Sequence, residues 1–520
     1  MERTSRLRHL RIIFGDQLDR NSAIFDGYDP QQDQLWMSEV EEEISYVPSH
    51  KQRIVLFLSA MRHFRAELEE AGKPVRYHPL QADRRHDSGK SFRDLISQTI
   101  REDRPETIRV VLPGDFRVKK VLEEIAAEHE IPLEILPDLH FYCTVNEFHK
   151  FAKGRKTLLM ETFYRQMRKK HDLLMRDGKP FGGSWNYDHD NRESFPKHGP
   201  GKIGHPTSFQ HDEITQEVVA LVEARYPDHP GSLDSFALPV TPGQASRMLS
   251  DFVRWHLPDF GRFEDAMWTD EPFLNHSRLS TCMNLKLLDP RDCVAAAVKA
   301  YQDGSAPLAS VEGFVRQIVG WREFIRGVYW TRMPDYAELN YFEHDQPIPS
   351  FFWSGQTEMR CVGQSMKHVL EHGYVHHIHR LMVLGNLAMT YGMHPYEFHR
   401  WHMAMYLDAV DWVSLPNTLG MSQHGDGGVV GTKPYCSTGN YIDKMSNFCH
   451  GCKYHPKKAM GDEACPITTF YWDFLDRHYD RLQNNQRMKL QLKHIERKRD
   501  NGEIEAIRQH ADHLRKVWQS

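Results

Sequence analysis

Three cysteines lie close together near the C-terminal end of this 520-residue chain. Cys449, Cys452 and Cys465 follow the spacing C-x2-C-x12-C, with glycines and a proline between them. Two thiolates at C-x2-C spacing can bind one metal centre from both ends of a tight turn, and two further cysteines complete four ligands. The proline after Cys465 is typical of iron–sulfur ligand runs, but zinc sites can have it too. The motif therefore predicts a metal centre, iron–sulfur or zinc, against the alternative of three unrelated thiols.

Polar residues within apolar helical patterns indicate a second kind of site. His376 and Arg380 are four residues apart and share a helix face, with His377 beside them. A lone histidine is usually a core or surface residue, whereas a histidine pair next to an arginine favours a functional site. Residues 313–324 place arginine and glutamate on a helix with a buried pattern, and such residues require partners, which indicates a polar ligand.

Residues 275–280, Asn-His-Ser-Arg-Leu-Ser, precede a predicted helix. Hydroxyls and backbone N–H groups at the start of a helix can bind a phosphate group. Two capping serines explain the same pattern equally well, so both interpretations remain open.

The elements that position these residues belong to a chain long enough for two or three domains. Its 40% hydrophobic and 26% charged residues are typical of a globular protein. The net charge of −5 means that any nucleic-acid binding requires a local basic patch. Eight cysteines are too few for a secreted disulfide scaffold, and the sequence contains no signal peptide and no apolar run that could span a bilayer. We therefore expect a cytoplasmic protein without membrane contact.

Strand and helix patterns alternate over residues 1–140. Strands are predicted at residues 9–14, 34–40, 75–80, 108–112 and 132–136, and helices at residues 51–71, 92–101 and 116–129. This order predicts a doubly wound parallel sheet with helices on both faces. The turn after the first strand lacks G-x-G-x-x-G, which argues against a standard nicotinamide-binding domain. A crevice near Asp16 and Glu43 can still hold a ligand, although solvated caps are the simpler interpretation.

Residues 141–230 are predicted to form a connector, followed by a large all-α domain over residues 231–520. The connector contains a basic helix candidate at residues 153–170, where phosphate contact competes with a solvated face. In the C-terminal part, helices are predicted at residues 242–255, 291–302, 311–330, 366–371, 377–391, 396–411 and 468–497.

Several of these motifs match one family in combination. They are Gly15-Asp16-Gln17-Leu18, residues 59–64, Gln317 with residues 320–324, His376-His377 with Arg380 and Met382, residues 415–417 with 420–423, residues 431–435, and the cysteines. Together they resemble the photolyase/cryptochrome superfamily, and within it the iron–sulfur bacterial cryptochromes and prokaryotic (6-4) photolyases. The resemblance runs essentially end to end and implies an α/β antenna domain followed by an all-helical FAD-binding domain.

The resemblance also implies a [4Fe–4S] cluster, which decides between iron–sulfur and zinc. The four ligands of the family match Cys361, Cys449, Cys452 and Cys465. Cys361 is the match for the fourth ligand, rather than the closer Cys436. The other four cysteines are expected to be free thiols.

By resemblance, residues of the helical domain hold FAD. The residues expected to line its pocket are His276, Ser277, Leu279, Ser280, Gln317, Arg322, His377, Arg380, Asp408, Ser414 and Asn417. The spacing of Arg380 and Asp408 matches an ion pair beside the isoalloxazine, where a guanidinium stabilises the anionic reduced ring. Ser414 falls at the position that faces flavin N5, and it departs from the carboxylate or amide of relatives; Asn417 is close enough to substitute.

The family implies light-driven repair of pyrimidine–pyrimidone (6-4) photoproducts in UV-damaged DNA. Photoexcited reduced FAD donates an electron to a lesion that has been flipped out of the stack. His376 and His377 are the expected proton donors. Tyr435 and Tyr441 match residues of the lesion pocket, and Trp401 and Trp353 match the family's route for photoreducing the flavin. Core packing is the alternative for each tryptophan.

The family's antenna is 6,7-dimethyl-8-ribityllumazine, and Asp16, Glu43 and Phe57 fall at matching positions in the N-terminal crevice. DNA is expected to dock on the helical domain through phosphate contacts. The family also uses a divalent cation, Mg²⁺, for which the acidic loop 188–190 is a candidate. We expect a monomer without an obligate protein partner.

Two rival functions remain open at this point. A blue-light photoreceptor cryptochrome would have the same cofactors without repair. A primase-like or nuclease-type DNA-binding protein would use the cluster structurally, but the flavin motifs argue against it.

Overall fold

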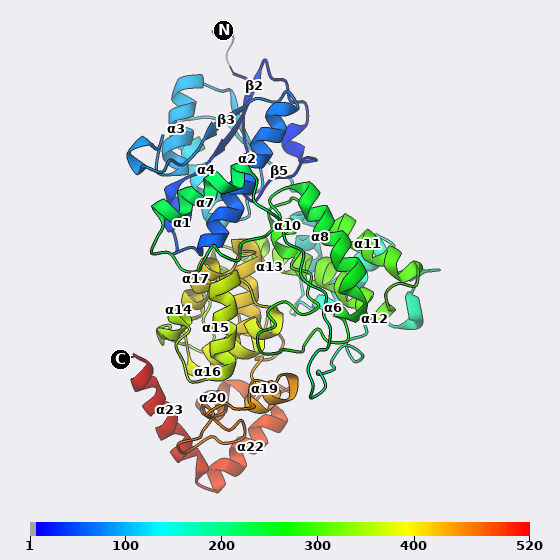
Figure 1. The fold of residues 1–520 in the computed structure, drawn as a ribbon, viewed down its shortest axis with the longest axis vertical. Helices are drawn as coiled ribbons and strands as arrows, with labels where there is room; N and C mark the ends of the chain where they lie inside the picture. Colours follow the sequence, from blue (N-terminus) through cyan, green and yellow to red (C-terminus); the bar gives the residue numbers. More distant parts are fainter. Residues whose placement is uncertain (1–6, 156, 520) are drawn as a thin grey trace.

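The computed structural model describes residues 7–155 and 157–519, and Figure 1 shows an α/β part above a helical part. The N-terminal part contains a five-stranded parallel sheet of order β3-β2-β1-β4-β5. Its strands are β1 (His9–Ile12), β2 (Asp33–Ser38), β3 (Val75–His78), β4 (Thr107–Val111) and β5 (Leu133–Leu136). The predicted strands and their parallel arrangement are therefore confirmed.

Helices cover both faces of this sheet because its central strands are apolar on both sides. Helices α3 (Phe92–Asp103) and α4 (Phe116–Glu128) pack with Leu10, Ile12 and Ile108 on one face. Helix α2 (Lys51–Glu70) packs with Leu35 and Met37 on the other. The strand order reverses between β1 and β4, and an open sheet forms a ligand crevice at the carboxyl ends of the strands at such a point.

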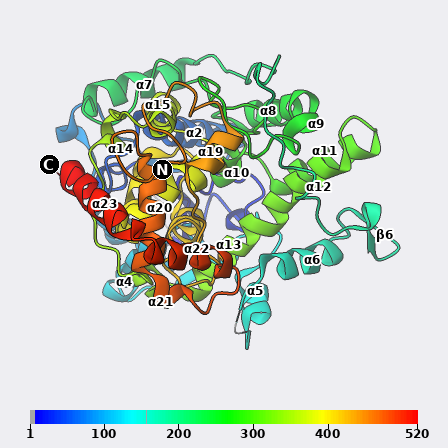
Figure 2. The ribbon, with the colours of Figure 1, turned by 90° about the horizontal axis from the view of Figure 1, so that it is seen from below.

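The connector divides its contacts between the two parts. Helix α7 (Glu213–Arg225) packs against α2, whereas α5 (Val145–Ala152) and α6 (Met160–Lys170) pack against the helical part. Figure 2 shows α5, α6 and the ribbon of β6 (Met175–Arg176) and β7 (Lys179–Pro180) at one edge of the molecule. The helix predicted over residues 153–170 is wrong in its first third: Gly154 adopts a φ of +74° and separates α5 from α6. Lys156 lies outside the described residues.

The C-terminal part is helical, as predicted. Its longer helices are α8 (Pro242–Trp255), α11 (Pro290–Gln302), α12 (Leu308–Val315), α13 (Glu323–Arg332), α15 (Arg360–His372), α16 (Asn386–Tyr391), α17 (Pro395–Met405), α20 (Pro466–Arg477), α22 (Lys489–Asp500) and α23 (Glu503–Gln519). Short helices connect them: α9 (Leu257–Phe260), α10 (Ser280–Asn284), α14 (Phe351–Ser354), α18 (Asp411–Leu415), α19 (Gly439–Met445) and α21 (Tyr479–Leu482). Helix α20 packs against both α22 and α23.

Two predicted helices of this part end early. The one predicted over residues 396–411 ends at Met405, because Tyr406 adopts an extended conformation, so Asp408 lies in a loop. The one predicted over residues 468–497 is divided into α20, α21 and α22, and Asn485 forms side-chain bonds typical of a turn at the break. Within the described residues, no helix has the length and apolar character needed to cross a membrane.

Three segments of the helical part are wound as π-helix, which the sequence analysis missed. They are η4 (Arg316–Arg322), η6 (His379–Gly385) and η7 (Pro416–Ser422). Each continues an α-helix, and η6 contacts η7. Such turns occur frequently at functional sites, and all three carry residues predicted to line the flavin pocket.

Candidate functional site

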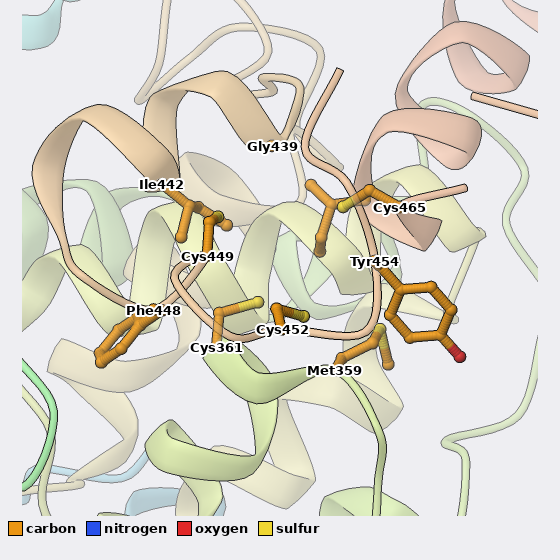
Figure 3. Close-up of a pocket in the computed structure, with 10 residues that line it drawn as sticks. Met359, Cys361, Gly439, Ile442, Phe448, Cys449, Cys452, Tyr454 and Cys465 are labelled. Carbon is orange, nitrogen blue, oxygen red and sulfur yellow. The ribbon is translucent and has the colours of Figure 1, made fainter. Parts of the chain in front are cut away.

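Four cysteines, three from one short segment and Cys361 from a distant one, line one cavity (Figure 3). Cys361 opens helix α15, Cys449 and Cys452 lie in the loop after α19, and Cys465 caps α20. Apolar side chains, including Phe448, complete a wall around an open space of about 330 Å³. Gly439 is required here because a Cβ atom would stand 3.1 Å from the Cys465 sulfur.

The thiols are too widely spaced for a single zinc ion. Zn–S bonds of about 2.3 Å place tetrahedral thiolates about 3.8 Å apart. Among the described residues, one group of three histidines brings its metal-ligating atoms within 4.8 Å of one another. The four cysteines do not form such a group. Burial, together with the three neighbouring thiols, raises the pKa of Cys361. A metal cluster bound by four thiolates fits this cavity better than four free thiols do.

The three histidines are His276, His376 and His377, and their ring nitrogens converge. The His276 and His376 rings are stacked, with centroids 4.2 Å apart and planes inclined by 11°. Stacked rings direct their lone pairs along parallel planes, so one ion cannot lie in both planes. Burial lowers the pKa of His276 and of His376 well below the ordinary value, so both are neutral near pH 7. The stacking thus disfavours one metal ion here, and the two buried rings are neutral hydrogen-bonding groups near pH 7.

His377 differs from its neighbours because its side chain is 49% exposed. Its Nε2 atom lies 3.5 Å from Asp265 Oδ1. The Tyr441 hydroxyl also donates to Asp265, so this carboxylate connects the predicted proton donor with a predicted lesion-pocket residue. Sequence reasoning missed Asp265 and its buried neighbour Glu264, because both lie in an irregular loop without a motif.

Arg380 and Asp408 form the ion pair that their spacing predicted. Arg380 Nη1 lies 3.0 Å from Asp408 Oδ1, and the Ser280 hydroxyl donates to Asp408 Oδ2 at 2.7 Å. The guanidinium lies over the Tyr406 ring at 4.0 Å. The pair lowers the pKa of Asp408 despite burial, so the carboxylate stays ionised. Ser280 therefore orients the pair, and its predicted part in a phosphate cradle stays a prediction.

Arg322 lies at the end of η4 and is 8% exposed. Its guanidinium stacks 4.2 Å from the Phe141 ring and donates to the Met283 carbonyl. In the part of the chain that the structure describes, its Nε atom has no hydrogen-bond partner, and its Nη1 atom has only the longer ion-pair contact with Glu323 Oε1 at 3.7 Å. Buried donors of this kind usually bind a polar ligand or water, so Arg322 fits a ligand pocket.

The other predicted flavin residues lie on nearby elements. Ser277 and Leu279 precede α10, Gln317 is on η4, Ser414 ends α18 and Asn417 is on η7. The Ser277 hydroxyl accepts the Leu279 N–H at 3.3 Å, and Asn417 donates to the Val413 carbonyl at 2.9 Å. This bond of Ser277 is local to the turn before α10, whose N-cap position is Leu279 and which has no side-chain cap, so both interpretations of the segment stay predictions.

An aromatic series leads away from the Arg380–Asp408 pair. Tyr406, beneath Arg380, lies 5.7 Å from the buried Trp401, whose ring is 5.3 Å from Phe352. The adjacent Trp353 is 37% exposed at the surface. Tyr435 and Tyr441 are partly buried against the same core cluster as Trp401. Sequence reasoning placed both tryptophans in an electron route but missed Tyr406.

A second cavity, of about 900 Å³, lies at the reversal point of the sheet. Asp16, Glu43 and Phe57 line it, as predicted, and Met403 and Asp411 of the helical part close its far side. Its lining is mostly apolar with a few charged groups, as in small-molecule sites. Arg53 lies 4.5 Å from the Phe57 ring, and its Nη1 atom has no hydrogen-bond partner among the described residues. The backbone N–H of Trp412 donates to the Gly114 carbonyl at 3.1 Å, and this bond joins the two parts beside the cavity.

Comparisons with known proteins agree with this architecture. Residues 11–238 match the family described as deoxyribodipyrimidine photo-lyase-related protein. The chain is 44% identical over 482 residues to a protein of Agrobacterium fabrum named (6-4) photolyase, covering 93% of this chain and 94% of the relative.

Solved structures share the fold. A bacterial class III photolyase from Agrobacterium tumefaciens matches with a TM-score of 0.58 at 13% identity, over 92% of this chain and 98% of that one. A cryptochrome from Synechocystis matches with a TM-score of 0.54 at 13% identity, over 85% and 87%. The fold is therefore that of photolyases and cryptochromes. Within that class, this chain belongs to the (6-4) photolyase family, and membership implies an FAD cofactor.

Proposed function

We propose that this protein repairs pyrimidine–pyrimidone (6-4) photoproducts in DNA with the energy of light. The observation that carries the proposal is the convergence of three imidazoles at a half-exposed site, with His377 and Tyr441 held by one carboxylate. Repair of a (6-4) lesion requires proton transfer, and such a site supplies it. The 44% identical relative that bears the name (6-4) photolyase supports the same function.

FAD, when bound, supplies the light-driven electron. Arg380 with Asp408, Arg322 with its unpartnered Nε atom, and Asn417 are the residues that would hold and polarise it. Ser280 keeps Asp408 in place for Arg380. Trp401 and Trp353 would connect this pocket to the surface, with Tyr406 at the start of the series.

The histidines divide the proton chemistry between them. His377 is the acid that gives a proton to the lesion, because its ring is half exposed and Asp265 Oδ1 lies 3.5 Å from its Nε2 atom. His376 is buried and neutral, so it acts beside His377 by orienting the lesion through its ring N–H. Tyr435 and Tyr441 would contact the flipped-out lesion beside the histidines.

The other cofactors follow from the remaining cavities. The four cysteines would bind a [4Fe–4S] cluster, for which their wide spacing and apolar surroundings are suited. The cavity at the sheet would bind 6,7-dimethyl-8-ribityllumazine, with Arg53 and Glu43 as polar partners and Phe57 against the ring. Asp188 forms an ion pair with the buried Arg316, so a Mg²⁺ ion at loop 188–190 would compete with that pair.

The test is repair of two oligonucleotides under blue light with reductant and magnesium, one carrying a (6-4) photoproduct and the other a cyclobutane dimer. We expect light-dependent restoration of the (6-4) lesion alone. Repair of the cyclobutane dimer would mean that the lesion pocket is misassigned. Repair of neither, by protein with bound and photoreducible FAD, would favour a photoreceptor.

A further inference from the structure

A hydrogen-bonded chain leads from the cysteine cavity toward the histidines. The Ser365 hydroxyl donates to the Cys361 carbonyl one turn earlier on α15, at 2.8 Å. His379 Nδ1 lies 2.8 Å from the same hydroxyl oxygen. A serine hydroxyl has a single hydrogen, so its oxygen can only accept from His379. His379 is therefore fixed with its proton on Nδ1.

The opposite side of His379 contacts His376. The two rings meet edge to face, with centroids 4.6 Å apart and planes at 87°. His376 is also stacked on His276, so its ring contacts two imidazoles. The Ile378 N–H donates to His376 Nδ1 at 3.4 Å, which leaves the proton of the neutral ring on Nε2.

His379 also contacts the second wall of the cysteine cavity. Its ring is 5.7 Å from that of Phe448, which lines the cavity beside Cys449. Ser365 and His379 are both fully buried. An apolar pair would fill this volume without the desolvation of two polar groups, so packing alone does not account for them.

We propose that Ser365 and His379 are positioning residues for His376, through which the cysteine cavity sets the geometry of the proton-transfer site. The proposal rests on the proposed function, because it assigns His376 a role in repair. A filled cavity holds Cys361 and Phe448 in place. Cys361 then positions His379 through the Ser365 hydroxyl, and Phe448 contacts the His379 ring directly. A rearranged cavity would release the His376 ring while the flavin pocket stays intact.

The chain offers a matched control in His368. It lies on the same helix as Ser365, is 1% exposed and is 6.1 Å from the His379 ring. Among the described residues, neither of its ring nitrogens has a hydrogen-bond partner, so it is outside the chain of bonds. Its replacement tests for general disturbance of this part of the core.

The experiment compares Ser365→Ala, Ser365→Thr, His379→Asn and His368→Asn in the full-length protein with its cofactors. Iron and FAD content, affinity for lesion DNA and repair per absorbed photon are measured, together with the imidazole ¹⁵N–¹H NMR signals of His376. We expect Ser365→Ala and His379→Asn to keep their iron, FAD and DNA affinity but to repair about tenfold more slowly. The His376 signals should change from one Nε2–H form to a mixture of tautomers. Ser365→Thr, which retains the hydroxyl, should restore both properties, and His368→Asn should leave them unchanged.

Wild-type repair and an unchanged His376 spectrum in both Ser365→Ala and His379→Asn would overturn the proposal. Loss of iron in step with repair would also overturn it, because the pair would then support only the cavity. If the wild-type protein repairs no (6-4) lesion, the proposed function fails, whereas the His376 spectrum still tests the positioning.

Discussion

The cysteine cavity and the histidine site lie next to each other but are built in opposite ways. Three of the four thiols come from one short segment and face apolar walls, so the cavity can stabilise the fold. The histidine site collects its residues from loops and short helical segments over almost two hundred residues, and it buries polar groups without hydrogen-bond partners among the described residues. The difference teaches that local motifs supply stability here, while the chemistry depends on dispersed positions that themselves lower stability.

The largest effect should come from a change in the cysteine cavity. Cys449→Ser removes one ligand from the cavity, so iron binding and the packing around α19 and α20 should both be lost. We expect at least tenfold less soluble protein and a thermal midpoint lower by about 10 °C. Cys436→Ser, a thiol outside the cavity, is the control and should change neither. A stable Cys449→Ser protein with full iron content would break the comparison.

The next largest effect should come from the histidine site, and it should lower repair without lowering stability. His377→Asn removes the exposed imidazole that Asp265 orients, so repair should fall about 100-fold or more. The thermal midpoint and FAD content should not change, because the side chain is half exposed. Repair assays are compared with those of His189→Asn, an exposed histidine of the connector. Retained repair in His377→Asn would exclude this residue as the proton donor.

A smaller effect should separate flavin binding from folding. Asp408→Asn leaves Arg380 without its carboxylate, so FAD should bind roughly tenfold more weakly while the apoprotein remains folded. Equilibrium dialysis followed by flavin fluorescence measures this affinity. Asp270→Asn, which breaks an exposed ion pair with Lys367, provides the control. Equal FAD affinity in both variants would contradict the assignment of the Arg380–Asp408 pair.

The smallest effect concerns stability within the histidine site. Burial raises the pKa of Glu264 to about 7 from its ordinary value of 4.5. The folded protein therefore binds this proton more tightly, and the resulting stabilisation is full below pH 4.5 and lost as pH rises through about 7. Glu264→Gln should consequently be more stable than wild type at pH 8, by about 1–2 kcal/mol, with little difference near pH 4.5.

Denaturant unfolding at both pH values measures this difference. The exposed Glu358, paired with Lys453, is the matched control, and Glu358→Gln should not alter the pH dependence. A Glu264→Gln protein less stable than wild type at pH 8 would mean that the ionised carboxylate has a stabilising partner.

The sequence predicted the sheet, the helical domain and the cysteine motif because each depends on local patterns or on short spacings. The pair of Arg380 and Asp408 was predicted through resemblance, although Asp408 proved to lie in a loop rather than in a helix. Asp265, Tyr406 and Arg53 were missed because their roles arise from tertiary contacts between distant segments. The π-helical turns were also missed, since one extra residue in a helical turn leaves the apolar pattern nearly unchanged.

The cavity at the sheet has a far wall made of Met403, Val410 and Asp411. During synthesis the ribosome releases the α/β part long before these residues. At about 5–20 residues per second, the nascent sheet waits some tens of seconds with its crevice open to water. A ligand that needs both walls can therefore bind only after residues 403–411 have been made and the helical part has packed against the sheet.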